Sequence, residues 1–459
     1  MTIPSANTAL LFKHYPVMTN KEDYSLIEAM LRRRSRRFGK GMKLGGALDY
    51  QSQYPPQPLT LEQEALLGFA ASGVTGYALA ELPYAPAALS STGSGGNIMV
   101  NFIGRTVASA DAIHAVAVFI TNDEGTWLLK RPQDYLRTEI SSLIDLSQNG
   151  QFVELYERSR VKVAQVRIDL PRRLPYLMPF NAWAANVPGT TYFLAVNELS
   201  ALYINVLLSM FSEDVGFFMV DERNGYRPAG VEKFAKSKGG HLEDDLTKES
   251  FTYIGAAETL LAEFVAWEQG SIHQNLGLMT QALGLGGYPH FAAHPYIWFE
   301  RLGFRMEQVP FTKMSGMNRL TKKIVQWMGK DTLVPNPVGL EKDGEVLLKS
   351  YAPPYYRNME EAVLAFIDHK YNAKQGTFRD GGEETGWQDG RAIQAAIPEY
   401  SERAIAATIA CCEYIYNRYG RFPATTGAFR TLLAYQTHQL DPDFYRRYYR
   451  HDAMSMESK

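Results

Sequence analysis

Apolar positions recur every three to four residues along much of this chain, and that spacing predicts amphipathic helices. In residues 23–33, for example, Leu26, Ile27, Met30 and Leu31 share one face of a helix. The same periodicity predicts helices at 60–72, 133–158, 197–211, 255–283, 357–369, 398–419, 425–438 and 441–452. Helices are therefore expected over the whole length of the chain.

Two sequence signals mark where helices begin and end. Thr60 is followed three residues later by Gln63, which is the spacing of a capping box at a helix N-terminus. Gly284 directly follows residues 255–283, and glycine is a common residue just beyond a helix C-terminus. Residues 255–283 form the longest predicted helix.

Shorter runs of β-branched and apolar residues predict strands. Residues 113–121 form such a run, and 126–130 form a second one after the turn sequence Asn-Asp-Glu-Gly. Two such runs around a short polar turn predict a hairpin. Further strands are expected at 163–169 and 216–222. Residues 222–250 are polar and rich in turn residues, which favours an inserted loop or lid.

The composition is that of a globular protein with nearly balanced charge. The 459 residues are 46% hydrophobic and carry a formal net charge of −2. Since so small a net charge provides no general attraction to nucleic acid or to an anionic membrane, neither partner is expected. No apolar run reaches about 18 residues and the N-terminus lacks an export signal, so the cytoplasm is the expected location. Adjacent Cys411 and Cys412 fall in a helical pattern, as two small buried apolar residues.

Positive charge is concentrated in residues 31–43, which read LRRRSRRFGKGMK and include seven Lys or Arg. A solvated basic face and a nucleic-acid arm are two interpretations of such a run. A third is a phosphate site, in which arginine side chains and a serine hydroxyl bind a dianion. Ser35 between the arginines and the apolar Phe38 favour the phosphate site.

The segment Arg33-Arg34-Ser35-Arg36-Arg37 lies between two predicted helices. It resembles the N-terminal signature of the FMN-dependent nitroreductase family. In that family, the matching residues hold the phosphate and the ribityl chain of FMN. The resemblance therefore implies that Arg33, Arg34, Ser35 and Arg37 bind this cofactor.

Two further segments resemble the same family. Residues 90–92, Ser-Ser-Thr, are similar to a loop that lies against the flavin ring, and Asn97 is the nearest following amide. Residues 273–290 (HQNLGLMTQALGLGGYPH) resemble the core helix and the turn beside the flavin. The resemblance implies that backbone amides at His290 and Phe291 reach the N5 and O4 edge of the ring.

A last match is weaker and lies further along the chain. Residues 336–339, Asn-Pro-Val-Gly, and then Lys349 resemble a strand and a distal phosphate-binding lysine. The cofactor positions implied by all four matches are Arg33, Arg34, Ser35, Arg37, Ser90, Ser91, Thr92, Asn97, Gly286, Gly287, Pro289, His290, Phe291 and Lys349.

The family resemblance implies an α+β fold, in which helices flank a central and mainly antiparallel sheet. It assigns residues 1–354 to an FMN-binding domain, with 222–250 as a candidate lid. Residues 355–459 are then a helical C-terminal extension. The resemblance also implies a homodimer with FMN at the subunit interface.

The activity implied by the resemblance is FMN-dependent oxidoreduction, with ping-pong hydride transfer through flavin N5. NAD(P)H is the expected reductant, and the expected acceptor is a small aromatic, quinone or nitro-type compound. Because the flavin carries the hydride, no catalytic side chain is assigned. The alternative is a protein with the same fold that binds flavin or a partner without turnover.

Motifs for other chemistries are absent from the sequence. There is no G-x-S-x-G, His-Glu-x-x-His, Cys-x-x-Cys or Walker motif, and no G-x-G-x-x-G after a strand. His290 and His294 lie four residues apart, with Glu300 beyond them. A proline follows His294 and the choice of a third ligand is arbitrary, so no metal is expected.

Overall fold

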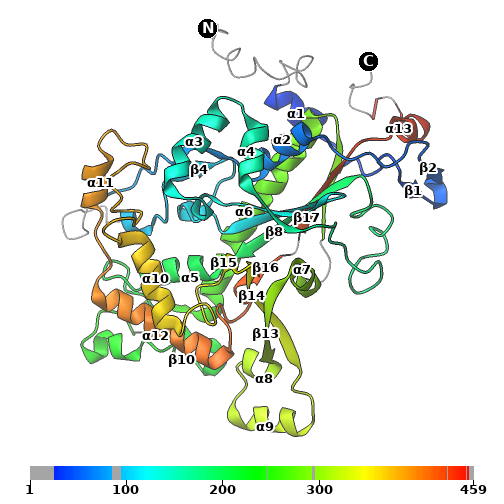
Figure 1. Cartoon of the computed structure of the whole chain (residues 1–459). Coiled ribbons are helices and arrows are strands. Elements are labelled where there is room, and N and C mark those ends of the chain that lie inside the picture. Colours follow the sequence, from blue (N-terminus) through cyan, green and yellow to red (C-terminus); the bar gives the residue numbers. More distant parts are fainter. Residues whose placement is uncertain are drawn as a thin grey trace.

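The computed structural model describes residues 25–84, 95–245, 247–291, 295–431, 433–450 and 452–453. Helices and strands are mixed throughout these residues (Figure 1). The α-helices are α1 (Leu26–Arg32), α2 (Leu61–Ser72), α3 (Arg137–Gln148), α4 (Phe152–Ser159), α5 (Ser200–Met210), α6 (Ile254–Ala282), α7 (Pro295–Leu302), α8 (Phe311–Met314), α9 (Arg319–Trp327), α10 (Met359–Tyr371), α11 (Gly390–Ala396), α12 (Glu402–Tyr419) and α13 (Pro442–Tyr448). The strands are β1 (Lys43–Leu44), β2 (Tyr50–Gln51), β3 (Val74–Tyr77), β4 (Ile103–Arg105), β5 (Val116–Asn122), β6 (Gly125–Leu129), β7 (Arg160–Ala164), β8 (Thr190–Glu198), β9 (Phe218–Asp221), β10 (Arg227–Pro228), β11 (Phe251–Tyr253), β12 (Gly286–Phe291), β13 (Phe304–Pro310), β14 (Leu333–Lys342), β15 (Glu345–Lys349), β16 (Phe429–Arg430) and β17 (Leu433–His438).

The largest sheet has the strand order β12-β17-β8-β5-β6-β7, and each neighbouring pair is antiparallel. The short strand β16 also pairs with β8. Strands β5 and β8 are buried along their whole length. Complete burial of a strand requires cover on both faces of the sheet.

Two different layers provide that cover. On one face, Val118 of β5 belongs to a cluster with Ile272 and Leu276 of α6 and with residues of α2. On the other face, Phe119 clusters with Trp298 of α7 and with residues of the β13–β14 hairpin. Val118 and Phe119 face opposite layers because successive side chains alternate along a strand.

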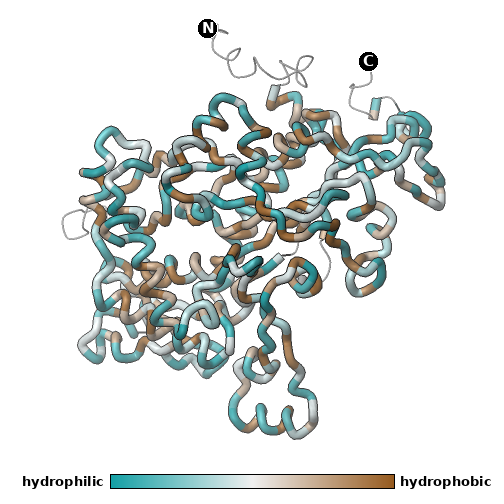
Figure 2. Tube along the Cα trace, viewed as in Figure 1, coloured by the Kyte–Doolittle hydropathy of each residue, from teal (hydrophilic) through white to brown (hydrophobic). Residues whose placement is uncertain are grey.

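The largest hydrophobic cluster lies beside this sheet and joins α5, α10 and α12. Cys411 and Cys412 of α12 belong to it as free, buried thiols, as expected. Residues 222–250 pack here too, through buried Val231 and Leu242. The hydropathy view shows apolar residues concentrated between these elements (Figure 2).

Several sequence predictions are confirmed at atomic detail. The capping box of α2 is complete, since the Gln63 N–H donates to Thr60 Oγ1 over 3.3 Å and the Thr60 N–H donates to Gln63 Oε1 over 3.0 Å. Strands β5 and β6 form the predicted hairpin. Helix α6 ends at Ala282, and Gly284 adopts a φ of +68°, a conformation that favours glycine.

Two predicted boundaries are wrong. Residues 133–158 form two helices, α3 and α4, because the chain turns at Asn149 and Gly150. Gly150 has a φ of +70°, which a continuous right-handed helix does not contain. The strand expected at 163–169 is β7, which ends at Ala164.

The helix predicted at 425–438 is also wrong, because this segment contains strands β16 and β17. Strand β17 lies between β12 and β8 in the largest sheet. Its residues from Ala434 to His438 are all buried. A strand buried on both faces has no alternation of apolar and polar residues, so its sequence resembles that of a buried helix. The last hundred residues are therefore not all helical, since they supply an interior strand.

Candidate functional site

The arginine loop, defined here as residues 33–37, follows the C-terminal end of α1. Arg33, Arg34 and Ser35 are exposed, whereas Arg36 is buried. The loop therefore presents two guanidinium groups and a hydroxyl to solvent. Such a group of donors suits an anion with several acceptor oxygens.

Arg36 connects the arginine loop to the end of α6. It forms an antiparallel β-bridge with Gly287, and its Nη2 donates to Leu285 O over 2.9 Å. The Arg34 N–H donates to Gln281 Oε1 over 3.3 Å. A cation beside the C-terminal carbonyls of α6 is favoured by the helix dipole. Two motifs found separately in the sequence are thus in direct contact, although Arg36 and Leu285 lie 249 residues apart.

Gly286 and Gly287 lie where other parts of the chain approach β12 closely. A Cβ on Gly287 would lie 2.7 Å from Tyr435 Oη and 2.8 Å from Gln436 O, and a Cβ on Gly286 would lie 2.9 Å from Arg36 O. Contacts this short are not tolerated in a close-packed interior. Of the two glycines that the family resemblance assigned to the cofactor, Gly286 is therefore required where the arginine loop packs against β12, and Gly287 is required where β12 packs against β17.

Arg37 is held by residues that no sequence signal identified. Its Nη2 donates to Asn181 Oδ1 over 2.6 Å. Its guanidinium carbon lies 4.4 Å from the ring centroid of Tyr288 and 5.4 Å from that of Trp183. These cation–π contacts fix the guanidinium between β12 and the segment that precedes β8.

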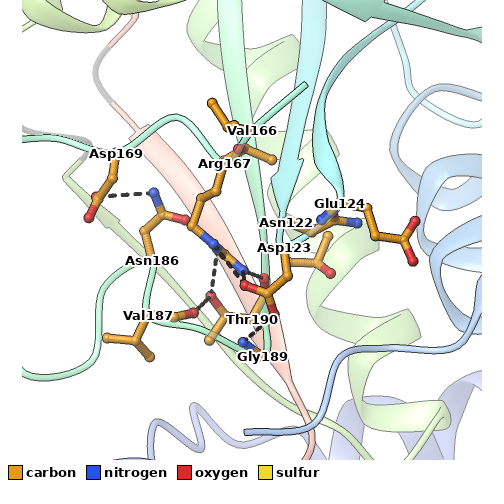
Figure 3. Close-up of polar contacts among 12 residues, drawn as sticks. Asn122, Asp123, Glu124, Val166, Arg167, Asp169, Asn186, Val187, Gly189 and Thr190 are labelled. Atoms are coloured by element: carbon orange, nitrogen blue, oxygen red, sulfur yellow. Dashed lines mark hydrogen bonds and ion pairs between the residues drawn. The ribbon is translucent and has the colours of Figure 1, made fainter. Parts of the chain in front are cut away.

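The segment that carries Asn181 is fastened to the central sheet by Arg167, which sits among its partners in Figure 3. Arg167 donates to Asp123 Oδ1 over 2.8 Å and to Asn186 Oδ1 over 2.7 Å. It also donates to Thr190 O over 2.7 Å. One side chain therefore joins the turn of the β5–β6 hairpin to the loop before β8 and to the start of β8.

A cavity of about 280 Å³ opens beside the arginine loop. Its walls are largely aromatic, and Phe38 stacks on Phe444 with ring centroids 4.1 Å apart. The lining residues are Arg34, Ser35, Arg36, Arg37, Phe38, Leu44, Leu48, Trp183, Phe444, Tyr445, Tyr449 and Ala453. The predicted C-terminal helix, seen as α13, thus lies at the site.

Strand β12 forms a neighbouring wall and lies at the edge of the largest sheet. Beyond the bridge at Gly287, its outer edge pairs with no other strand among the described residues. The side chains of Pro289 and Phe291 are exposed, the latter to 64%. An unpaired edge offers backbone N–H and C=O groups to a ligand.

Two buried histidines, His273 of α6 and His290 of β12, lie close to this wall. Burial lowers the pKa of each to about 4, and the charge of Arg37 also acts on His290. Both imidazoles are therefore neutral at pH 7. Within the described residues, Nε2 of His273 is buried and has no hydrogen-bond partner. The two histidines therefore add no charge to this wall.

The structure does not bring Lys349 to the arginine loop. Lys349 lines a separate cavity of about 470 Å³, and its Nζ lies 5.0 Å from the ring centroid of Tyr356. Arg137 and Glu384 line the same cavity, and burial raises the pKa of Glu384 to about 7. The expected phosphate role of Lys349 at the arginine loop has no support from this placement.

The remaining implied positions are also away from the arginine loop or outside the described chain. Asn97 packs elsewhere, where its carbonyl accepts hydrogen bonds from Lys370 Nζ and, over 3.3 Å, from Tyr400 Oη. Ser90, Ser91 and Thr92 lie outside the described residues. No described residue of 222–250 lines either cavity.

No protein-family profile and no curated protein sequence matches this chain. One of the solved structures that match is a candidate nitroreductase from Ralstonia eutropha JMP134. The match covers 61% of this chain and 75% of that chain, with 12% sequence identity and a TM-score of 0.29. A TM-score this low carries no weight for fold or function.

Two further findings concern metals and membranes. In the described part of the chain, no group of three or more His, Cys, Asp or Glu side chains is arranged to hold a metal ion. His294 lies outside that part. None of the described helices combines the length and the apolar composition that crossing a bilayer requires.

Proposed function

We propose that this chain is an FMN-dependent oxidoreductase of the nitroreductase type, with the cofactor bound between the arginine loop and β12. One observation carries the proposal: Arg36 pairs with Gly287, so the arginine loop and the glycine-rich end of α6 form one surface. Residues 33–37 and 273–290 are two of the segments that resemble flavin-binding elements of that family, and 273–290 is the strongest match.

The phosphate would lie at the exposed end of this surface. Arg33, Arg34 and Ser35 provide donors on a solvent-facing loop. Hydrogen bonds from guanidinium groups to phosphate oxygens are short and strong because both partners are charged. Lys349 takes no part in this arrangement, because it lines the other cavity.

The ring system would lie along the outer edge of β12. There, Tyr288 and Arg37 form a cation–π pair, and the outer edge of the strand at His290 and Phe291 has no strand partner among the described residues. His273 and His290 add no charge to this wall at neutral pH, because burial lowers the pKa of each. When bound, FMN would supply hydride chemistry at its N5, and the chain would position it and exclude water.

A second copy of the chain would complete the site. The face of α1 that precedes the arginine loop exposes Leu26, Ile27, Met30 and Leu31. Four large apolar side chains on one exposed face are typical of a protein interface. A homodimer through this face would place the partner subunit next to the arginine loop.

The test is the flavin content of the purified protein. We expect flavin absorption bands and close to one FMN per chain after heat release. Replacing Arg33 and Arg34 with Ala removes two charged donors and should weaken FMN binding at least about tenfold. Arg357→Ala is the matched control, because Arg357 is exposed just before α10 and lines neither cavity.

Other outcomes decide between the alternatives. A wild-type protein that neither contains nor takes up FMN contradicts the proposal. FMN binding without reduction by NADH or NADPH supports the alternative of a flavin-binding protein without turnover. Nucleic-acid binding that is lost in the double variant, with flavin content unchanged, would assign the arginine loop to a nucleic-acid arm instead.

A further inference from the structure

The β13–β14 hairpin extends away from the sheet and carries α8 and α9 at its tip (Figure 1). Helix α9 is the outermost element of this arm, and none of its residues is buried. The arm contributes to neither cavity. Neither packing in the core nor a role at the two cavities therefore explains why the chain has this arm.

One face of α9 is apolar and exposed. Leu320, Ile324, Trp327 and Met328 follow the spacing of a single helical face, and Trp327 is 88% exposed while Leu320 is 71% exposed. Exposing an apolar stripe to water is unfavourable, so we expect another molecule to cover it.

Basic residues lie beside the apolar face of α9, opposite it and just beyond the C-terminal end of the helix. Arg319, Lys323 and Lys330 are exposed, and Lys322 is half-buried. No Asp or Glu occurs from Arg319 to Lys330. The next residue, Asp331, accepts hydrogen bonds within the tip and interacts electrostatically with Lys322, so the excess positive charge lies at Arg319, Lys323 and Lys330.

The arm holds α9 in place through α8. Arg418 of α12 donates from Nη2 to Gly316 O over 3.0 Å. Asp331 accepts from the Thr312 N–H over 2.9 Å and from Thr312 Oγ1 over 2.7 Å, which closes the loop around α9. These hydrogen bonds therefore fix the position of α9 at the tip of the arm.

We propose that α9 docks the protein on an anionic lipid surface. An apolar stripe with Trp beside a lysine-rich face is the pattern of helices that lie in the membrane interface, with the apolar side chains among the acyl chains and the cations at the headgroups. A two-fold contact between copies would bring equal patches together and place like charges close to each other. The charge pattern thus favours lipid over a second copy. The proposal is independent of the proposed flavin chemistry.

The proposal revises the expectation from composition that no membrane partner exists. The overall net charge of −2 describes the whole chain, whereas binding depends on the local charge of α9. Residues 319–330 contain four cations and no anion.

The test is co-flotation of the full chain with lipid vesicles. We expect binding to vesicles of phosphatidylcholine with phosphatidylglycerol, little binding to phosphatidylcholine alone, and weaker binding at high salt. Ile324→Ser with Trp327→Ser should reduce binding roughly tenfold or more, and Lys322→Glu with Lys323→Glu should do the same. Trp267→Ser and Lys374→Glu are matched controls, because Trp267 is 54% exposed on α6 and Lys374 is exposed beyond α10.

Two results would overturn the proposal. One is equal binding of the wild type and both double variants to anionic vesicles. The other is a wild type that binds no vesicles, together with an apolar double variant whose molecular mass in solution is lower than that of the wild type. That result would assign α9 to a contact between copies of the chain. Sedimentation velocity and far-UV circular dichroism on each variant separate these outcomes from loss of folding.

Discussion

Arg36 and Gly287 pair at a point where the neighbouring Gly286 carries no side chain that would meet Arg36 O. The signals that the sequence offered here were local: a short run of arginines around Ser35 and a glycine pair at the end of a long helix. Asn181 and Trp183, which hold Arg37, could not be found in this way. They belong to an irregular segment, where no periodicity reports what a side chain contacts.

Replacing Gly287, the partner of Arg36, with Ala should disturb the packing of β12 against β17. The new Cβ would lie 2.7 Å from Tyr435 Oη, so β12 or β17 must move. We expect a loss of about 1–3 kcal/mol in the free energy of unfolding and a lower FMN content. Urea denaturation measures the free energy of unfolding, and visible absorption measures the FMN content.

The control for this change is Gly45→Ala. Gly45 has a φ of −109°, and a Cβ added to it would have no neighbouring heavy atom within 4 Å. The substitution should therefore alter stability by no more than about 0.5 kcal/mol. If Gly287→Ala were as stable as Gly45→Ala and kept its FMN, the close packing at Gly287 would not matter for the site.

The buried histidine His273 predicts a pH dependence of stability. Its pKa is about 4 in the folded protein because of burial, compared with about 6.5 in an unfolded chain. Between these values the unfolded chain binds more protons, so stability is fully present above about pH 6.5 and is lost as the pH falls towards 4. His273→Gln should reduce this loss by up to about 3 kcal/mol at pH 4. Unfolding curves of both proteins from pH 4 to 8 measure it, and parallel curves would contradict the assignment.

At the scale of elements, prediction succeeded where local signals were complete. The hairpin of β5 and β6 has a polar turn between two apolar runs, and α2 has both partners of its capping box. It failed at β17, which is covered on both faces and therefore lacks alternation. It could not show that the β5–β6 turn is joined to the loop before β8, because Asp123 and Arg167 lie 44 residues apart.

That connection predicts the effect of Arg167→Met. Methionine keeps an apolar stem but removes the hydrogen bonds to Asp123, Asn186 and Thr190. We expect a loss of about 1–3 kcal/mol in the free energy of unfolding. FMN binding should also weaken, because Asn181 would no longer hold Arg37. Arg305→Met is the control, since its ion pair with Glu341 is 3.8 Å long and exposed. Equal stability of the two variants would show that the Arg167 contacts contribute little.

At the scale of the whole molecule, the arrangement depends on contacts between distant parts of the chain. The sheet brings together β5, β8, β12 and β17. Near the N-terminus, Arg36 of the arginine loop pairs with Gly287 of β12, and Gly39 just after the loop pairs with Leu440 beyond β17. Sequence periodicity reports which face of an element is buried but not which element covers it. This is why the fold class could be predicted as a mixture of helices and a sheet, whereas the interior position of β17 could not.

The proposed division of the chain at residue 354 can be tested by truncation. A chain of residues 1–354 lacks β17, so β12 and β8 would each have an unpaired edge inside the sheet. It also lacks α10 and α12, which leaves α5 without the helices of its hydrophobic cluster. We therefore expect this chain to aggregate or to lose cooperative unfolding, and to bind no FMN. A chain that lacks only residues 455–459 is the control and should behave as the full protein.

A soluble 1–354 chain with a cooperative unfolding transition would contradict this expectation and support an independent N-terminal domain. A chain of residues 1–424 gives the sharper comparison, because it keeps α10 and α12 and loses β16, β17 and α13. If it too fails to fold, the missing strand rather than the missing helices is responsible. If it folds but binds no FMN, the C-terminal strands and α13 serve the cavity beside the arginine loop, to which Phe444 and Tyr445 contribute directly.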